Sequence, residues 1–194
     1  MGKIRTLVFS GSFDPVHIGH AMVASYVSQC GVADEVWLMP SRINPLKTGH
    51  PPIADMHRLA MCELVARRCE RVNVSDVETL LPEPSFTYRT LTYLREHFPN
   101  REFMLLIGSD NWLIFDRWRD SGNITAEFKV VIYPRPGYDI DPLLLPPGVT
   151  LLSEAPQVLM SSSFVRRSLS EGKNLSFFLP SEVLNYINKH NLYG

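Results

Sequence analysis

Hydrophobic residues along this chain fall into two alternating patterns. Short apolar runs rich in Val, Ile, Leu and Phe predict buried strands, and the run at 103–107 fits a central parallel strand. The predicted strands cover residues 7–9, 35–39, 71–77, 103–107, 128–133 and 149–152. Apolar positions three and four apart predict helices over 21–30, 53–69 and 87–98, through 112–118, from 161–163 onward and through 183–187. This alternation predicts an α/β fold with a parallel sheet.

Polar and small residues follow the first predicted strand, in the stretch 11–20 before the first helix. Free N–H groups of such a turn and helix start carry partial positive charge and suit phosphate. We expect Asp14 to cap the helix and Pro15 to take its first position. His17 and His20 are three residues apart. On a first helical turn this spacing puts both imidazoles on one face, where they can hydrogen-bond to phosphate oxygens.

A histidine pair at this spacing is also half of a metal site. Zinc takes three or four protein ligands, and the chain has no HExxH helix. The three cysteines, Cys30, Cys62 and Cys69, show no CxxC spacing. We therefore rank phosphate above zinc and expect no protein-bound metal. The chain also lacks GxGxxG and GxxxxGK[ST], which excludes a redox dinucleotide fingerprint and a P-loop kinase.

Two further stretches carry donors at the ends of predicted elements. Parallel sheets bind ligands at the carboxyl ends of their strands, so Gly108 to Asp110, after the strand 103–107, is a second candidate turn. The loop 41–52 leaves the same edge and contains Arg42 and Lys47. The run Ser161 to Arg166 combines three hydroxyls at a helix start with an arginine one turn later. Alone, this run fits a plain helix cap, but beside 11–20 it indicates a second phosphate site.

Composition narrows the class of protein. The chain has 194 residues, 45% of them hydrophobic, which suits one domain over 1–194. A formal net charge of −1 gives no basic field for nucleic acid, and no apolar run is long enough to span a bilayer. Unpatterned cysteines predict reduced thiols in a cytoplasmic protein. A homo-oligomer is compatible with the sequence and stays open.

These motifs together resemble a known family. Gly11-Ser12-Phe13-Asp14-Pro15-x-His17-x-Gly19-His20 resembles the signature of nucleotidyltransferases with an HxGH motif. The segment 160–166 resembles their second signature, ISSTxxR, with Arg166 in the arginine position. Three segments, 85–91, 107–118 and 131–137, resemble one branch, the bacterial nicotinate-nucleotide adenylyltransferases. Arg89 departs from the branch pattern, which usually has Asp, and Leu46 stands in the place of a His.

The resemblance implies a Rossmann-like, doubly wound parallel sheet with a small C-terminal helical part. It also implies transfer of the adenylyl group of ATP, with Mg²⁺, to nicotinate mononucleotide, giving nicotinate adenine dinucleotide and pyrophosphate. No protein nucleophile is required, because the mononucleotide phosphate attacks the α-phosphorus directly. The HxGH and ISSTxxR motifs bind only the triphosphate, so a phosphopantetheine adenylyltransferase stays an alternative. A nucleotide-binding module without turnover is a second alternative, of another class.

Residue roles implied by the resemblance fall into three sets. The catalytic set is His17, His20 and Arg166. The ATP-binding set is Gly11, Ser12, Phe13, His17, His20, Lys47, Gly108, Asp110, Ser162, Ser163 and Arg166. The mononucleotide-binding set is Phe86, Thr87, Asp110, Trp118 and Arg135. Helical spacing alone explains Trp118 equally well as a core residue.

Overall fold

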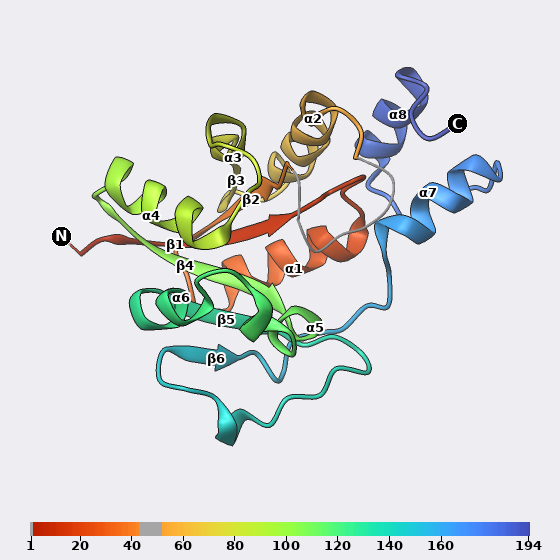
Figure 1. Ribbon diagram of the computed structural model, residues 1–194. Coiled ribbons are helices and arrows are strands. Elements are labelled where there is room, and N and C mark those ends of the chain that lie inside the picture. The colour runs from red at the N-terminus through yellow and green to blue at the C-terminus, as the bar shows by residue number, and fades with distance from the viewer. Residues whose placement is uncertain (1, 43–51) are drawn as a thin grey trace.

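The computed structural model describes residues 2–42 and 52–194 (Figure 1). Their strands form one six-stranded sheet in the order β3-β2-β1-β4-β5-β6, and every neighbouring pair is parallel. The strands are β1 (Ile4–Gly11), β2 (Glu35–Pro40), β3 (Val72–Val74), β4 (Arg101–Gly108), β5 (Lys129–Tyr133) and β6 (Val149–Leu151). This is the strand order of doubly wound dinucleotide-binding folds, so the predicted Rossmann-like α/β architecture is confirmed.

Helices cover both faces of the sheet, and the period-two alternation of strand side chains explains why. In β1, Leu7 and Phe9 belong to one core cluster, and Val8 belongs to the other. The first cluster takes buried side chains from α1, α2, α7 and α8, and the second takes them from α3, α4 and α6. The long helices are α1 (Ile18–Gln29), α2 (Asp55–Ala66), α4 (Thr87–His97), α7 (Ser162–Ser170) and α8 (Ser181–Lys189). The shorter ones are α3 (Val77–Leu80), α5 (Ser109–Trp112), η1 (Phe115–Arg117), α6 (Ser121–Glu127) and η2 (Pro142–Leu144).

Two predicted elements differ from the structure. The predicted strand 71–77 is only three residues long, because Val77 instead begins α3 and is buried in the second core cluster. The predicted helix through 112–118 is wrong. Its chain runs through α5 and the 3₁₀ turn η1 and is extended at Trp118. Trp112, Phe115 and Trp118 are spaced three apart, which suits a 3₁₀ turn, and their rings pack in series.

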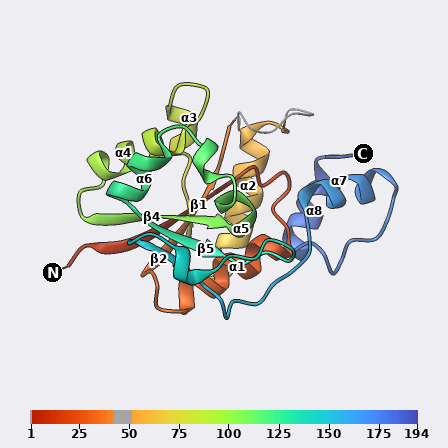
Figure 2. The ribbon, with the colours of Figure 1, turned by 60° about the horizontal axis from the view of Figure 1, so that its bottom comes forward.

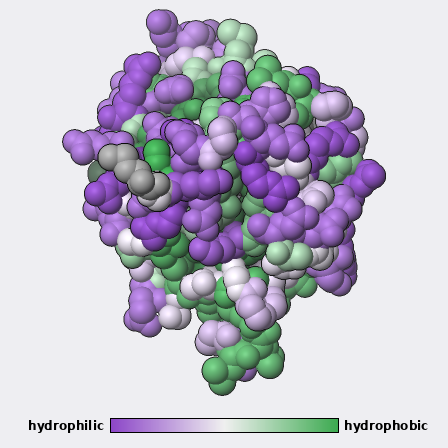
Figure 3. Space-filling model, turned by 90° about the vertical axis from the view of Figure 1, so that its left-hand side faces the viewer, coloured by the Kyte–Doolittle hydropathy of each residue, from purple (hydrophilic) through white to green (hydrophobic). Residues whose placement is uncertain are grey.

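The carboxyl ends of the strands lie at one edge of the sheet, where Gly11 pairs with Pro40 and Gly108 pairs with Tyr133. In Figures 1 and 2 the helices α7 and α8 lie beyond this edge. Figure 3 shows the molecule from the opposite end, where hydrophobic surface gathers on the lowest protrusion. This is the side of η2, on which Leu143 and Leu144 are exposed. No helix among the described residues is long and apolar enough to cross a membrane.

Candidate active site at the carboxyl ends of the strands

The turn after β1 differs locally from the expectation. Asp14 does not cap α1, because the N-cap is His17, and Pro15 lies before the helix in a turn with a cis Asp14–Pro15 bond. The Asp14 side chain points instead toward the C-terminal part of the chain. Its Oδ1 accepts a hydrogen bond from Tyr193 Oη at 2.7 Å, and its Oδ2 lies 3.6 Å from Arg166 Nη1. Asp14 therefore joins the turn to helices beyond the sheet edge.

The two histidines stack at the start of α1. Their ring centroids are 3.7 Å apart and their planes differ by 18°. The backbone N–H of His17 donates to His20 Nδ1 at 3.3 Å, so the neutral His20 ring carries its proton on Nε2. His17 is only 3% exposed, and burial together with the charge of Arg135 lowers its pKa from 6.5 to about 4. At neutral pH His17 is therefore an uncharged imidazole beneath His20.

Phe13 and Gly19 set the position of this histidine pair. The Phe13 ring is 1% exposed and packs edge-on against His20, with centroids 4.9 Å apart. A Cβ at Gly19 would lie 3.1 Å from the His17 ring, so the space that this glycine leaves is taken by His17. A Cβ at Gly11 would likewise lie 3.1 Å from the Phe13 ring, so this ring takes the space that Gly11 leaves. With its side chain buried, Phe13 offers a ligand only its backbone.

Helix α7 brings the second motif against the first. Ser161 is its N-cap and accepts a hydrogen bond from the Phe164 N–H. Ser162 Oγ donates to the Pro15 carbonyl at 3.0 Å, and Arg166 Nη1 donates to the Asp14 carbonyl at 2.6 Å. The two motifs, about 150 residues apart, are thus hydrogen-bonded to each other across the sheet edge.

The turns after β4 and β5 form the adjoining wall. Arg135 Nε lies 3.0 Å from Asp110 Oδ1, and the Arg135 N–H donates to the buried Ser109 Oγ at 2.8 Å. Gly108 has an ordinary extended conformation, with φ −75° and ψ 156°. A Cβ there would lie 2.6 Å from Arg135 Nε and closer still to Asp110 Oδ1. Gly108 is therefore required for space between the two charged groups. Arg135, His17 and His20 line one small pocket with Tyr133, whose hydroxyl donates to the Pro156 carbonyl.

Two residues predicted for the mononucleotide, Phe86 and Trp118, lie at the start of α4 and directly after η1. Phe86 is the N-cap of α4, which begins at Thr87 and has no side-chain cap. The Arg119 guanidinium lies 4.6 Å from the Phe86 ring centre, so the residue that follows Trp118 contacts the start of α4. The Trp118 indole Nε1 is buried without a hydrogen-bond partner among the described residues.

The predicted cations of the 41–52 loop receive less support. Arg42 is ion-paired with Asp55 at 3.4 Å and with Glu83 at 2.8 Å. Lys47 and Leu46 lie outside the described residues.

Arg58 has a role that the sequence reasoning missed. It is fully buried, and its Nη1 donates to the carbonyls of Ser12 and Ser41, each at 2.6 Å. Its Nη2 pairs with Asp55 at 2.5 Å. Arg58 therefore ties the turn after β1 to the chain after β2. The signal was present, since Arg58 is the one arginine on the helical face that also carries Met61, Cys62 and Val65.

Comparison with known proteins identifies the family. The sequence model of the cytidylyltransferase-like family matches residues 8–168. A Bacteroides fragilis protein named "Probable nicotinate-nucleotide adenylyltransferase" is 43% identical over 187 residues, which cover 96% of this chain and 92% of the relative. A Bacteroides thetaiotaomicron protein of the same name is 44% identical over 97% of this chain and 93% of its own length.

Solved structures agree on the fold. The nicotinic acid mononucleotide adenylyltransferase of Plasmodium falciparum, solved as a complex with NaAD, has a TM-score of 0.79 at 23% identity. The alignment covers 98% of this chain and 97% of that one. The curated relatives select the nicotinate branch over the phosphopantetheine alternative. The chain belongs to the cytidylyltransferase-like family and, within it, to the nicotinate-nucleotide adenylyltransferases.

Proposed function

We propose that this protein transfers the adenylyl group of ATP to nicotinate mononucleotide, releasing pyrophosphate and forming nicotinate adenine dinucleotide for NAD biosynthesis. One observation carries the proposal: Arg166 and Ser162 of the second signature hydrogen-bond to Asp14 and Pro15 of the first. The contact gathers cationic, hydroxyl and imidazole donors at the edge where parallel sheets bind nucleotides. This edge provides hydrogen-bond donors and positive charge, which suits a reaction between two anionic substrates.

We assign the triphosphate to the HxGH turn and α7. His20, with its Nε2 proton, donates to the α-phosphate as negative charge develops there. His17 supports the His20 ring by stacking and, being neutral, adds no charge of its own. Ser162, Ser163 and Arg166 hold the pyrophosphate end, and Gly11 and Ser12 lie along the nucleotide. Gly108 and Asp110 contact the ribose groups, and Lys47 stays a proposed further cation.

Mg²⁺ would be bound mainly by phosphate oxygens and water. Among the described residues, no three His, Cys, Asp or Glu side chains gather closely enough to hold a metal ion. Asp14, the carboxylate of the HxGH turn, is already bonded to Tyr193 and Arg166. This donor set fits an ion that is held by its nucleotide, since Mg²⁺ keeps most of its water and phosphate ligands in such sites. When bound, the ion would neutralise charge on the leaving pyrophosphate.

The mononucleotide lies, in this proposal, between Trp118 and the start of α4. Trp118 stacks on the nicotinate ring, and N–H groups around Phe86 and Thr87 donate to its carboxylate. A carboxylate accepts these bonds, whereas the NH₂ of an amide cannot. Arg135, also assigned to the mononucleotide, is ion-paired with Asp110.

The test measures pyrophosphate release and dinucleotide formation with Mg-ATP, with nicotinate mononucleotide in one reaction and nicotinamide mononucleotide in the other. We expect both products and a strong preference for the acid. Equal rates would refute the donors around Thr87 while leaving the transfer chemistry in place. No product with either mononucleotide would refute the proposed function and favour a binding module without turnover.

A further inference from the structure

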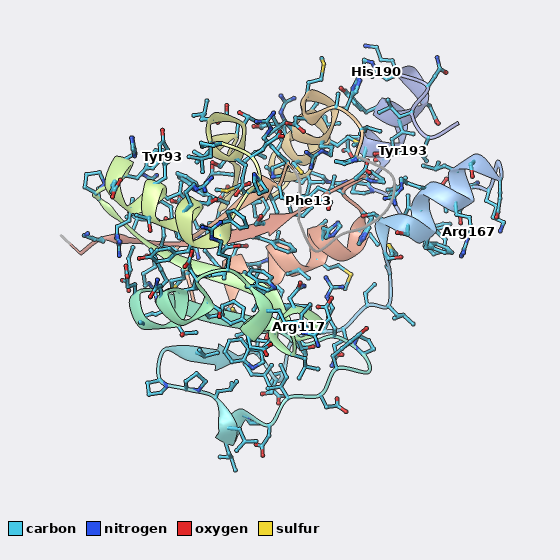
Figure 4. All side chains as sticks on the ribbon, in the orientation of Figure 1. Phe13, Tyr93, Arg117, Arg167, His190 and Tyr193 are labelled. Atoms are coloured by element: carbon cyan, nitrogen blue, oxygen red, sulfur yellow. The ribbon has the colours of Figure 1, made fainter. Side chains whose placement is uncertain are left out.

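The C-terminal end of the chain returns to the HxGH turn. Tyr193 Oη donates to Asp14 Oδ1 at 2.7 Å, and the Asp14 side chain is only 9% exposed. Asp14 also contacts Arg166 twice, through its carbonyl and through Oδ2. In Figure 4 the labelled Phe13 lies by the arrowhead of β1, and the labelled Tyr193 lies beside α8. The chain end is thus hydrogen-bonded to the residue that orients Arg166.

The backbone on both sides of this contact is strained. Tyr193 has a φ of +66° and Phe13, directly before Asp14, has a φ of +45°. Bulky residues rarely adopt this left-handed region, and they stay there only where their surroundings fix them. Burial and the bond to Asp14 raise the pKa of the Tyr193 hydroxyl, so it is a protonated donor at neutral pH.

Docking of α8 does not require this hydroxyl. Val183 and Ile187 are buried in the first core cluster, and Leu192 packs against it. A second tyrosine, Tyr186, bonds His57 Nδ1 on α2 at 2.9 Å. These contacts hold α8 on the sheet, so the bond from Tyr193 to Asp14 has a separate effect, on the HxGH turn.

We propose that Tyr193 is a positioning residue for the leaving pyrophosphate. By bonding one oxygen of Asp14, it fixes this residue so that the Asp14 carbonyl and Oδ2 hold the Arg166 guanidinium toward the triphosphate. The identity of the leaving group rests on the proposed function, whereas the contact itself does not. A structural role alone would affect both substrates equally, and the positioning role affects only the phosphate end.

The test compares Tyr193→Phe with Tyr186→Phe, which removes a hydroxyl from the same C-terminal region without touching the HxGH turn. Titration calorimetry with Mg-pyrophosphate gives the dissociation constant for each full-length variant. We expect Tyr193→Phe to bind about tenfold more weakly, as for loss of a hydrogen bond to a charged group. Tyr186→Phe should bind like the wild type. Adding Tyr193→Phe to Arg166→Ala should weaken binding no further, since both act through one contact.

Kinetics and thermal unfolding separate positioning from stability. We expect Tyr193→Phe to raise KM for ATP and to leave KM for the mononucleotide unchanged. The inference is overturned if Tyr193→Phe binds pyrophosphate like Tyr186→Phe, if it raises both KM values equally, or if wild type binds pyrophosphate no better than Arg166→Ala. Pyrophosphate binding as expected, with no turnover by the wild type, would refute the proposed function and support this inference.

Discussion

Gly108→Ala tests whether the space between Asp110 and Arg135 is part of the active site. The added Cβ would lie 2.6 Å from Arg135 Nε and nearer to Asp110 Oδ1. Ordinary contact between such atoms begins at about 3.5 Å. Arg135 must therefore retreat by about 0.9 Å, and Asp110 by more, which displaces both members of their 3.0 Å ion pair.

The same substitution should leave the fold intact. Gly108 has φ −75° and ψ 156°, which alanine adopts without strain, and the atoms that must move belong to side chains about one-third exposed. We expect the free energy of unfolding to change by less than about 1 kcal/mol. A displacement of about 1 Å at a reacting site costs on the order of 10²-fold in rate, so kcat/KM should fall by that factor.

The assay is dinucleotide formation over a range of both substrates, with urea unfolding of the same samples. Gly122→Ala is the matched control, because a Cβ there meets nothing within 4 Å and the position lies inside α6. It should keep full activity and stabilise the protein by about 0.5–1 kcal/mol. A fully active Gly108→Ala would remove the Asp110–Arg135 pair from the substrate site.

Three further predictions concern the HxGH turn. His20→Ala should lower kcat by on the order of 10²-fold or more while the fold survives. The control His97→Ala, at an exposed position, should keep the kcat of the wild type. A His20→Ala variant as active as the wild type would exclude His20 as a donor. Arg58→Met removes the buried guanidinium that donates to the Ser12 and Ser41 carbonyls and pairs with Asp55. It should reduce the urea-derived free energy of unfolding by about 3–5 kcal/mol, against at most about 1 kcal/mol for Arg68→Ala. The pKa of His17 is about 4 in the folded protein and 6.5 in the unfolded chain, so the unfolded chain binds the proton more tightly. The contribution of neutral His17 to the free energy of unfolding is therefore full above pH 6.5 and is lost as the pH falls toward 4. The loss amounts to about 3 kcal/mol. The prediction is contradicted if the free energy of unfolding falls with pH as steeply in His17→Asn as in the wild type.

The fold was predictable, and the two motifs at 11–20 and 160–166 were recognisable, because both rest on local signals. Alternation of apolar residues defines the strands, and the short spacing from Gly11 to His20 encodes turn and helix start together. Where a prediction failed, contacts with distant parts of the chain determined the local structure. Asp14 is of a residue type that commonly caps helices, but Tyr193 and Arg166 hydrogen-bond to it instead. Such partners, more than 150 residues away, leave no periodic trace in the sequence.

Arg58 and Gly108 show a second limit on what the sequence alone can predict. Composition suggests that an arginine in a helix is solvated, and only its place on the apolar face of α2 indicates burial. A glycine before a helix suggests a turn with unusual backbone angles. The structure shows ordinary angles at Gly108 and crowding by two side chains, which no local pattern encodes.

The two Asp–Arg pairs at the site differ in burial, and this difference suggests a division of roles. Asp14 is 9% exposed and fixed by Tyr193 as well as Arg166, so its orientation is set before any ligand arrives. The side chains of Asp110 and Arg135 are each 35% exposed, although the paired atoms Asp110 Oδ1 and Arg135 Nε are buried. In the proposed function, the side assigned to the triphosphate is therefore the more preorganised of the two. Because the reaction is a displacement at the α-phosphorus, rigidity is most useful on the side of the leaving group, where charge accumulates.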